Sequence, residues 1–126
     1  MTKIIIKEDC GNSPKNILLQ QFTIAIARRD TKFILDTIAD PIRWNFVGDR
    51  VIEGREDLAE FLKQLKSNKV TLLTIHHITS HGKAGAVDGM QKLESGETLA
   101  FCNVYEFGNT KGTLISDITS YLIHQK

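Results

Sequence analysis

The stretch ETLAFCNVYEF, residues 97–107, carries the clearest strand pattern in the chain. Alternate side chains of a strand lie on opposite faces of its sheet, and here the two faces differ in chemistry. One face has large apolar and aromatic side chains around a single amide, and its members are Leu99, Phe101, Asn103, Tyr105 and Phe107. A buried amide is costly without hydrogen-bond partners, so we expect Asn103 to find them on neighbouring strands.

Three more strands are predicted around this stretch, because the chain from Val70 onward lacks helix signals. Short turns that contain glycine divide it into strands at about 70–80, 83–94, 97–107 and 113–124. Short links join antiparallel neighbours. The second half of the chain therefore predicts a four-stranded antiparallel meander.

Helices are predicted in the first half. Ser13 and Pro14 are typical of a helix start, and apolar residues continue at helical spacing to about Arg28. Thr31 is positioned to cap a second, short helix, and Gly54 opens a third. Between the second and third helices, residues 42–47 alternate as a strand with a bulky face. The predicted fold class is α+β, with the helices on one face of a curved, mostly antiparallel sheet.

Length and composition indicate one ordinary globular domain that spans residues 1–126. Hydrophobic residues make up 41% of the chain and charged residues 25%, which gives no sign of disorder. A formal charge of +1 supplies no basic patch, so we expect no nucleic-acid partner.

Residues 1–12 are expected to form an N-terminal arm or a short edge strand. Their apolar run is too short for a signal peptide or a membrane span, so no membrane partner is expected. Cys10 and Cys102 have neither metal-site spacing nor the density of a disulfide scaffold. We therefore expect reduced thiols and a cytoplasmic location.

The hairpin registers suggest which polar residues meet. A two-residue loop at Ser95–Gly96 would set Asp88 opposite Asn103 and Met90 opposite Phe101. Across the last hairpin, pairing Phe107 with Thr113 would set Asp117 opposite Asn103. A two-residue loop at His81–Gly82 would place His77 on the same face, diagonal to Asp88. A slip of one residue in any hairpin would reverse the face of its strand.

This register predicts a row of Asp88, Asn103 and Asp117 across an otherwise apolar wall. Two carboxylates beside one amide in a water-poor cavity do not both ionise cheaply, so one pKa should be raised. A neutral carboxyl group can donate a hydrogen bond, and its ionised partner can accept a proton. The three residues are therefore the candidate catalytic groups, with Asp117 as acid or base, although a solvated outer face or a structural network would also explain them.

The order and spacing of several segments resemble the superfamily of ketosteroid isomerase, limonene epoxide hydrolase, the polyketide cyclase SnoaL and nuclear transport factor 2. The segments are AIARRDTKFILDTIADPIRWNFVG, the helix after Gly54, AFCNVYEF and GTLISDITSYLI. The resemblance implies a SnoaL-like domain built as a cone-shaped α+β barrel, or cystatin-like α+β roll, whose curved, mostly antiparallel sheet wraps around three N-terminal-half helices. It also implies a pocket inside the cone and a dimer formed through the outer face of the sheet.

The resemblance does not carry over the known catalytic residues. The isomerase tyrosine falls on Phe22, its general base on Phe46, and its oxyanion-side aspartic acid on Asn103. The last-strand aspartate of the epoxide hydrolases falls on Thr119. Neither activity is therefore expected.

Two functional hypotheses remain open at this point. The first is a pocket that binds a small, largely apolar or amphipathic organic molecule, with isomerase-, cyclase- or lyase-type proton transfer as an option. The second is a non-catalytic homodimeric binding or interaction module. The candidate ligand-binding residues share a bulky or polar side chain predicted near the pocket: Trp44, Phe22, Phe46, His77, Met90, Phe101, Tyr105, Thr119 and Tyr121. No cofactor is expected, and no metal, because the histidines lack a third ligand at a recognisable spacing.

The other face of residues 97–107 predicts a homodimer. It forms a surface of small apolar residues that should not face water as one patch. Its predicted members are Ala100, Cys102, Val104, Val87, Gly89, Leu114, Ile118 and Leu122.

Overall fold

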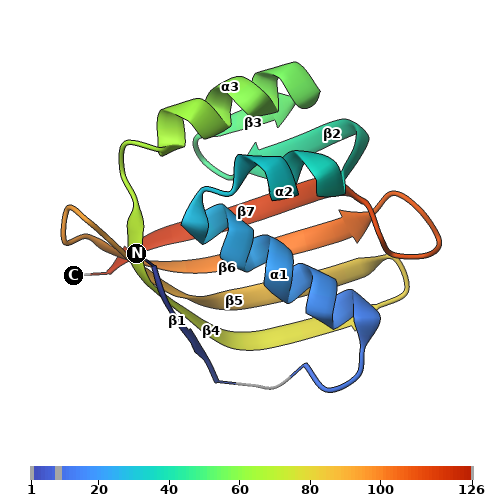
Figure 1. Ribbon diagram of the computed structural model, residues 1–126, viewed down its shortest axis with the longest axis horizontal. Helices are drawn as coiled ribbons and strands as arrows, with labels where there is room; N and C mark the ends of the chain where they lie inside the picture. The colour runs from blue at the N-terminus through green and yellow to red at the C-terminus, as the bar shows by residue number, and fades with distance from the viewer. Residues whose placement is uncertain (1, 8–9, 126) are drawn as a thin grey trace.

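A single mixed sheet forms the body of the protein, and three helices cover one of its faces (Figure 1). The computed structural model describes residues 2–7 and 10–125. In order across the sheet, the strands are β1 (Lys3–Ile6), β4 (Val70–His81), β5 (Ala84–Leu93), β6 (Thr98–Phe107), β7 (Ile115–Gln125), β2 (Ile38–Phe46) and β3 (Arg50–Glu53). The helices are α1 (Pro14–Arg28), α2 (Thr31–Thr37) and α3 (Arg55–Leu65). The predicted α+β class is confirmed.

The pairing of the strands refines the predicted sheet. The meander β4 to β7 is antiparallel, as expected, whereas β1 pairs with β4 and β2 with β7 in parallel. The two edges, β1 and β3, do not pair with each other, so the sheet stays open as a curved wall. The helices fill its concave side in place of barrel closure (Figure 1).

The N-terminal segment forms part of the sheet. The register of β1 on β4 runs from Lys3 opposite Leu72 to Ile6 opposite Ile75. This confirms the predicted edge strand for the described part of residues 1–12, while residues 1 and 8–9 lie outside the described chain. No helix of the described residues is long and apolar enough to cross a bilayer.

The helix starts follow local capping chemistry. The Ser13 side chain accepts a hydrogen bond from the Asn16 backbone N–H, and Pro14 occupies the first turn of α1, as predicted. The cap of α2 differs from the prediction, because the Asp30 side chain, one residue before Thr31, accepts from the Phe33 N–H. A carboxylate at this position also suits the positive end of the helix dipole.

The β5–β6 hairpin corrects the first predicted register. Its loop has three residues, 94–96, and the Leu93 N–H donates to the Glu97 carbonyl at 2.9 Å. Gly96, with φ of 94°, takes the left-handed position that closes such loops. Asp88 therefore pairs with Cys102 and not with Asn103, which pairs with Val87.

The β6–β7 hairpin corrects the second register. A β-bulge places one extra residue, Ser116, between the partners of Glu106 and Phe107. The bulge reverses the face of every later residue in β7. Before the bulge, Phe107 pairs with Ile115, two residues beyond the predicted Thr113. With the bulge added, Asp117 pairs with Glu106, and the residue opposite Asn103 is Ser120.

The β4–β5 hairpin corrects the third register. His81 pairs with Ala84 across a two-residue loop, and a bulge in β4 lies at His76. His77 then lies directly opposite Asp88, where the prediction placed it diagonally. The three corrections also move four predicted outer-face residues to the inner face, which faces the helices: Val87, Gly89, Ile118 and Leu122.

Candidate functional site

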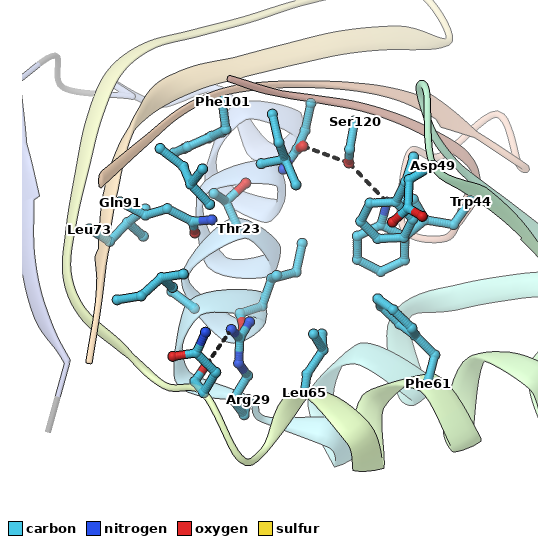
Figure 2. Close-up of a pocket in the computed structure, with 18 of the residues that line it drawn as sticks. Thr23, Arg29, Trp44, Asp49, Phe61, Leu65, Leu73, Gln91, Phe101 and Ser120 are labelled. Carbon is cyan, nitrogen blue, oxygen red and sulfur yellow. Dashed lines mark hydrogen bonds between the residues drawn. The ribbon is translucent and has the colours of Figure 1, made fainter. Parts of the chain in front are cut away.

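A cavity of about 330 Å³ lies between the inner face of the sheet and the helices α1 and α3 (Figure 2). This volume falls within the usual range for pockets that take small organic molecules. One wall comes from β4 and β6, through Leu73 and Phe101. The opposite wall comes from β2 and α3, through Trp44 and Phe61.

Aromatic rings form much of the second wall. Trp44 and Phe46 alternate with outward-facing residues along β2, and their rings stack with centroids 5.0 Å apart. Phe61 reaches them from α3, with its ring 5.1 Å from that of Phe46. Ring pairs at such distances stabilise the wall beyond simple burial. This wall suits a flat or flexible apolar body.

A chain of hydrogen bonds crosses the inner end of the cavity and begins at the indole (Figure 2). Trp44 Nε1–H donates to Ser120 Oγ at 2.9 Å, and the Ser120 hydroxyl donates to Asn103 Oδ1 at 2.7 Å. All three side chains are buried, so each pairing removes a desolvation cost. Asn103 thus finds the partners that its burial requires.

The chain continues behind the wall with a fixed direction. The Thr23 hydroxyl donates its one proton to the Leu19 carbonyl, so at the 2.8 Å contact with Tyr105 it accepts. The Tyr105 hydroxyl therefore donates to Thr23 and accepts from Asn103 Nδ2, 3.2 Å away. Burial raises the pKa of Tyr105 to about 12, against the opposing effect of these hydrogen bonds. The phenol stays neutral and serves as a support.

A charged side chain occupies the other end of the cavity. Arg29 follows α1, and its side chain rises into the cavity opposite Ser120 (Figure 2). Its Nη1 donates to the Ile26 carbonyl and its Nη2 to the Asn68 carbonyl, each at 2.9 Å. Burial lowers the pKa of the Arg29 guanidinium. The cavity is therefore neutral and hydrogen-bonded at one end and cationic at the other.

The candidate catalytic and ligand-binding residues divide into three groups. Trp44, Phe46, Phe101 and Asn103 line the cavity. Phe22 and Tyr105 are fully buried behind its wall, in edge-to-face contact at 5.8 Å. The remaining candidates pair within the sheet with outward-facing neighbours and do not line the cavity: His77, Met90, Asp88, Asp117, Thr119 and Tyr121.

The predicted row of Asp88, Asn103 and Asp117 is therefore wrong. The Asp88 carboxylate accepts a hydrogen bond from His77 Nδ1 at 2.9 Å. The Asp88 side chain is 40% exposed and the His77 side chain 70%. Asp117 accepts from the Ser116 hydroxyl on the same outer face. One extra loop residue places Asp88 on the outer face, and the bulge in β7 places Asp117 there, so these two carboxylates do not flank Asn103 in the cavity.

A second cavity, of about 380 Å³, lies on the outer face of the sheet. Its lining includes His77, Asp88, Cys102 and Tyr121, which follow one another across β4 to β7. Burial raises the pKa of the Cys102 thiol, and the charge of Asp88 adds to this effect. This thiol is therefore poorly suited to act as a nucleophile.

Sequence reasoning missed the most informative polar residues of the cavity. Ser120 was hidden by the bulge in β7, because simple alternation assigns it to the outer face. Arg29 was not among the candidate residues. Its signal was an arginine at a helix end, where a glycine is usual. Phe61 was not a candidate either, and it forms part of the cavity wall.

The ionisable lining of the cavity is sparse. Among the described residues it consists of Arg29, at the end opposite Ser120, and of Asp49 and Arg50, which are exposed. Arg50 lies over the Phe61 ring at 5.5 Å, with its Nε 3.7 Å from the Asp49 carboxylate. Within residues 2–7 and 10–125, no three His, Cys, Asp or Glu side chains gather as a metal site.

Solved structures with the same architecture identify the fold. A nuclear transport factor 2-like protein of unknown function from Cytophaga hutchinsonii is 21% identical, with a TM-score of 0.68 over 86% of this chain and 99% of that one. An LEH-like epoxide hydrolase from Mycobacterium tuberculosis is 20% identical, with a TM-score of 0.73 over 86% of this chain and 81% of that one. A further protein of unknown function, from Burkholderia xenovorans, reaches 0.74 at 18% identity over 89% and 84%.

The chain has the nuclear transport factor 2-like fold. Structures described as ketosteroid isomerase and SnoaL-like polyketide cyclase share this fold with it, as the sequence resemblance predicts. No protein-family model matches the chain, and no curated protein matches it. The comparisons show the fold, and the cavity's own residues must indicate its function.

Proposed function

We propose that the protein binds a small amphipathic organic molecule in the cavity between the sheet and the helices. The observation that carries this proposal is the lining, in which aromatic and aliphatic walls surround a few polar groups. Trp44, Ser120 and Asn103 already satisfy one another, so an apolar body can enter without stranding them. Such a site gains affinity chiefly from removing apolar surface from water.

The placement of the ionisable groups favours binding over proton transfer. A general base must come within hydrogen-bond reach of the proton that it removes. The inner wall offers an amide, a hydroxyl and an arginine, and the one carboxylate of the described lining, Asp49, is exposed. Phe22 and Phe46 occupy the positions that resemble the isomerase's acid and base, and neither transfers protons.

The single tryptophan of the chain gives a direct test, because Trp44 forms part of the cavity wall. Titration with 1-octanol should change the intensity or wavelength of its emission in a saturable manner. Ala27→Leu places a larger side chain in the lining of this cavity and should weaken the effect by about tenfold, because it takes volume from the ligand.

Ala100→Leu is the matched control, because Ala100 lines the outer cavity and not the inner one. It should leave the titration unchanged. A titration without saturation, or one weakened by Ala100→Leu and insensitive to Ala27→Leu, would contradict the proposal.

We also propose that a second copy of the chain covers the outer face of β6 and β7. Val104, Tyr121 and Ile123 are exposed there, and 62% of Ile123 is accessible. Exposed apolar groups on one sheet face are typical of a protein interface. Sedimentation at micromolar concentration should show a dimer that Ile123→Lys dissociates, whereas a strict monomer would contradict this part. A cytoplasmic location is part of the same proposal, based on the sparse cysteines.

A further inference from the structure

The backbone at Arg29 is unusual. Its φ of 59° and ψ of 39° lie in the left-handed region, and it is the sole non-glycine residue with positive φ in the described chain. Glycine adopts this conformation without a steric cost, whereas a residue with a Cβ pays about 1 kcal/mol or more. A residue held in this way often serves a site. At this position, the conformation directs the arginine side chain into the cavity (Figure 2).

The guanidinium of Arg29 has unused donors. Of its five N–H groups, one bonds the Ile26 carbonyl and another the Asn68 carbonyl. Nε is buried and has no partner. Within the described residues, no carboxylate forms an ion pair with this side chain. The two carbonyls fix the plane of the guanidinium and leave hydrogen-bonding capacity free.

A ligand anion would complete the contacts of this side chain. Arginine stays protonated in proteins, so the partly buried guanidinium keeps its positive charge, and no carboxylate of residues 2–7 and 10–125 is paired with it. A carboxylate is planar and matches two parallel N–H groups of a guanidinium. Asp30, the neighbouring carboxylate, is engaged at the start of α2 by the Phe33 N–H.

We infer that the ligand is an amphipathic acid whose carboxylate is bound by Arg29 while its apolar body lies between the aromatic wall and Phe101. This inference rests on the proposed function and names the class of molecule. The neutral end of the cavity then meets the far end of the ligand. Asn103 Nδ2 has a second N–H that is not used by Tyr105, and it can donate to an oxygen there.

Two probes of equal chain length separate the charge from the apolar body. Octanoate and 1-octanol are titrated separately against the full chain, with Trp44 emission as the readout. We expect octanoate to bind more tightly than 1-octanol, and octylamine to bind more weakly than either. The ratio of the 1-octanol Kd to the octanoate Kd should fall by about tenfold in Arg29→Gln, as expected for a lost charge-assisted pair.

Variants of the same residue guard against a folding defect. Arg29→Gly suits the left-handed backbone, and it should abolish the preference for octanoate while it preserves 1-octanol binding. Arg29→Lys keeps the charge without the planar fork and should retain part of the preference. Arg50→Gln is the matched control, because Arg50 is an exposed arginine of the same lining. It should change the ratio by less than about twofold, since solvent screens its charge.

The outcomes distinguish the inference from the proposed function. Binding of 1-octanol without a preference for octanoate would overturn the role of Arg29 and leave the proposed function standing. A preference that disappears in Arg50→Gln and survives in Arg29→Gly would also overturn it. Saturation by neither probe would overturn both.

Discussion

Polar side chains on the two faces of the sheet differ in burial and in hydrogen bonding, although both faces are formed by the same strands. On the inner face, Asn103 and Ser120 are buried in a directed chain of hydrogen bonds. On the outer face, Asp88 and Asp117 are partly exposed and bond to their neighbours on that surface. One loop residue and single-residue bulges decide which group lies on which face. The chemistry available to a residue here depends on its face more than on its type.

Substitution within one strand should give the largest contrast between the faces. A Cβ at Gly89, on the inner side of β5, would overlap the Thr74 carbonyl oxygen. We expect Gly89→Ala to lower the free energy of unfolding by more than about 3 kcal/mol, because backbone atoms must move. Chemical denaturation measures the loss.

Asp88→Ala is the control, since it places the same side chain one residue away on the outer face. It should cost less than about 1 kcal/mol, the usual value of an exposed ion pair. Equal losses for the two variants would break the contrast between the faces.

Alkaline pH should reveal the burial of Tyr105. Its pKa is raised from 10.0 to about 12 in the folded protein, so the unfolded chain loses this proton first as pH rises. The stabilising contribution is fully present below pH 10 and is lost between pH 10 and about 12. This difference in pKa between the unfolded and folded states corresponds to a loss of about 3 kcal/mol of stability at most.

Denaturation of Tyr105→Phe across this range should therefore show a shallower fall in stability than the unaltered protein. Tyr121→Phe supplies the comparison, because Tyr121 is exposed on the outer face. Its curve should follow that of the unaltered protein. If Tyr121→Phe flattens the curve and Tyr105→Phe does not, the assignment of the buried phenol is wrong.

The smallest effect is expected from Asp117, the residue that the sequence predicts as the acid or base of a catalytic row. Asp117→Asn should change the free energy of unfolding by less than about 0.5 kcal/mol, because the side chain is partly exposed and bonds only to Ser116 among the described residues. Binding of 1-octanol should not change. A tenfold loss of binding in this variant would return Asp117 to the functional site.

The sequence predicts the fold well because its signals are local and agree with one another. Alternation in residues 97–107, the Ser13–Pro14 helix start and Gly54 each mark an element that the structure contains. The aromatic wall of Trp44 and Phe46 follows from the similar alternation of residues 42–47.

The polar part of the site depends on features that alternation does not encode. A three-residue loop with Gly96 shifts β5 by one residue, so Asp88 is no longer opposite Asn103. In β7, Phe107 pairs with Ile115 instead of Thr113, and the bulge at Ser116 adds one more residue to the shift. Together they exchange Asp117 for Ser120 opposite Asn103. The sequence does not predict Arg29 as a cavity residue, because its position depends on a left-handed backbone conformation at the end of a helix. That conformation places its side chain in the cavity.

Nuclear magnetic resonance of the ¹⁵N-labelled protein, titrated with 1-octanol, tests the inner cavity most directly. The chain has one indole N–H, at Trp44, and its signal should shift together with the side-chain amide of Asn103. The backbone amides of Cys102 and Tyr121, in the outer cavity, should stay in place. Shifts confined to Cys102 and Tyr121, with the Trp44 and Asn103 signals unmoved, would contradict the account.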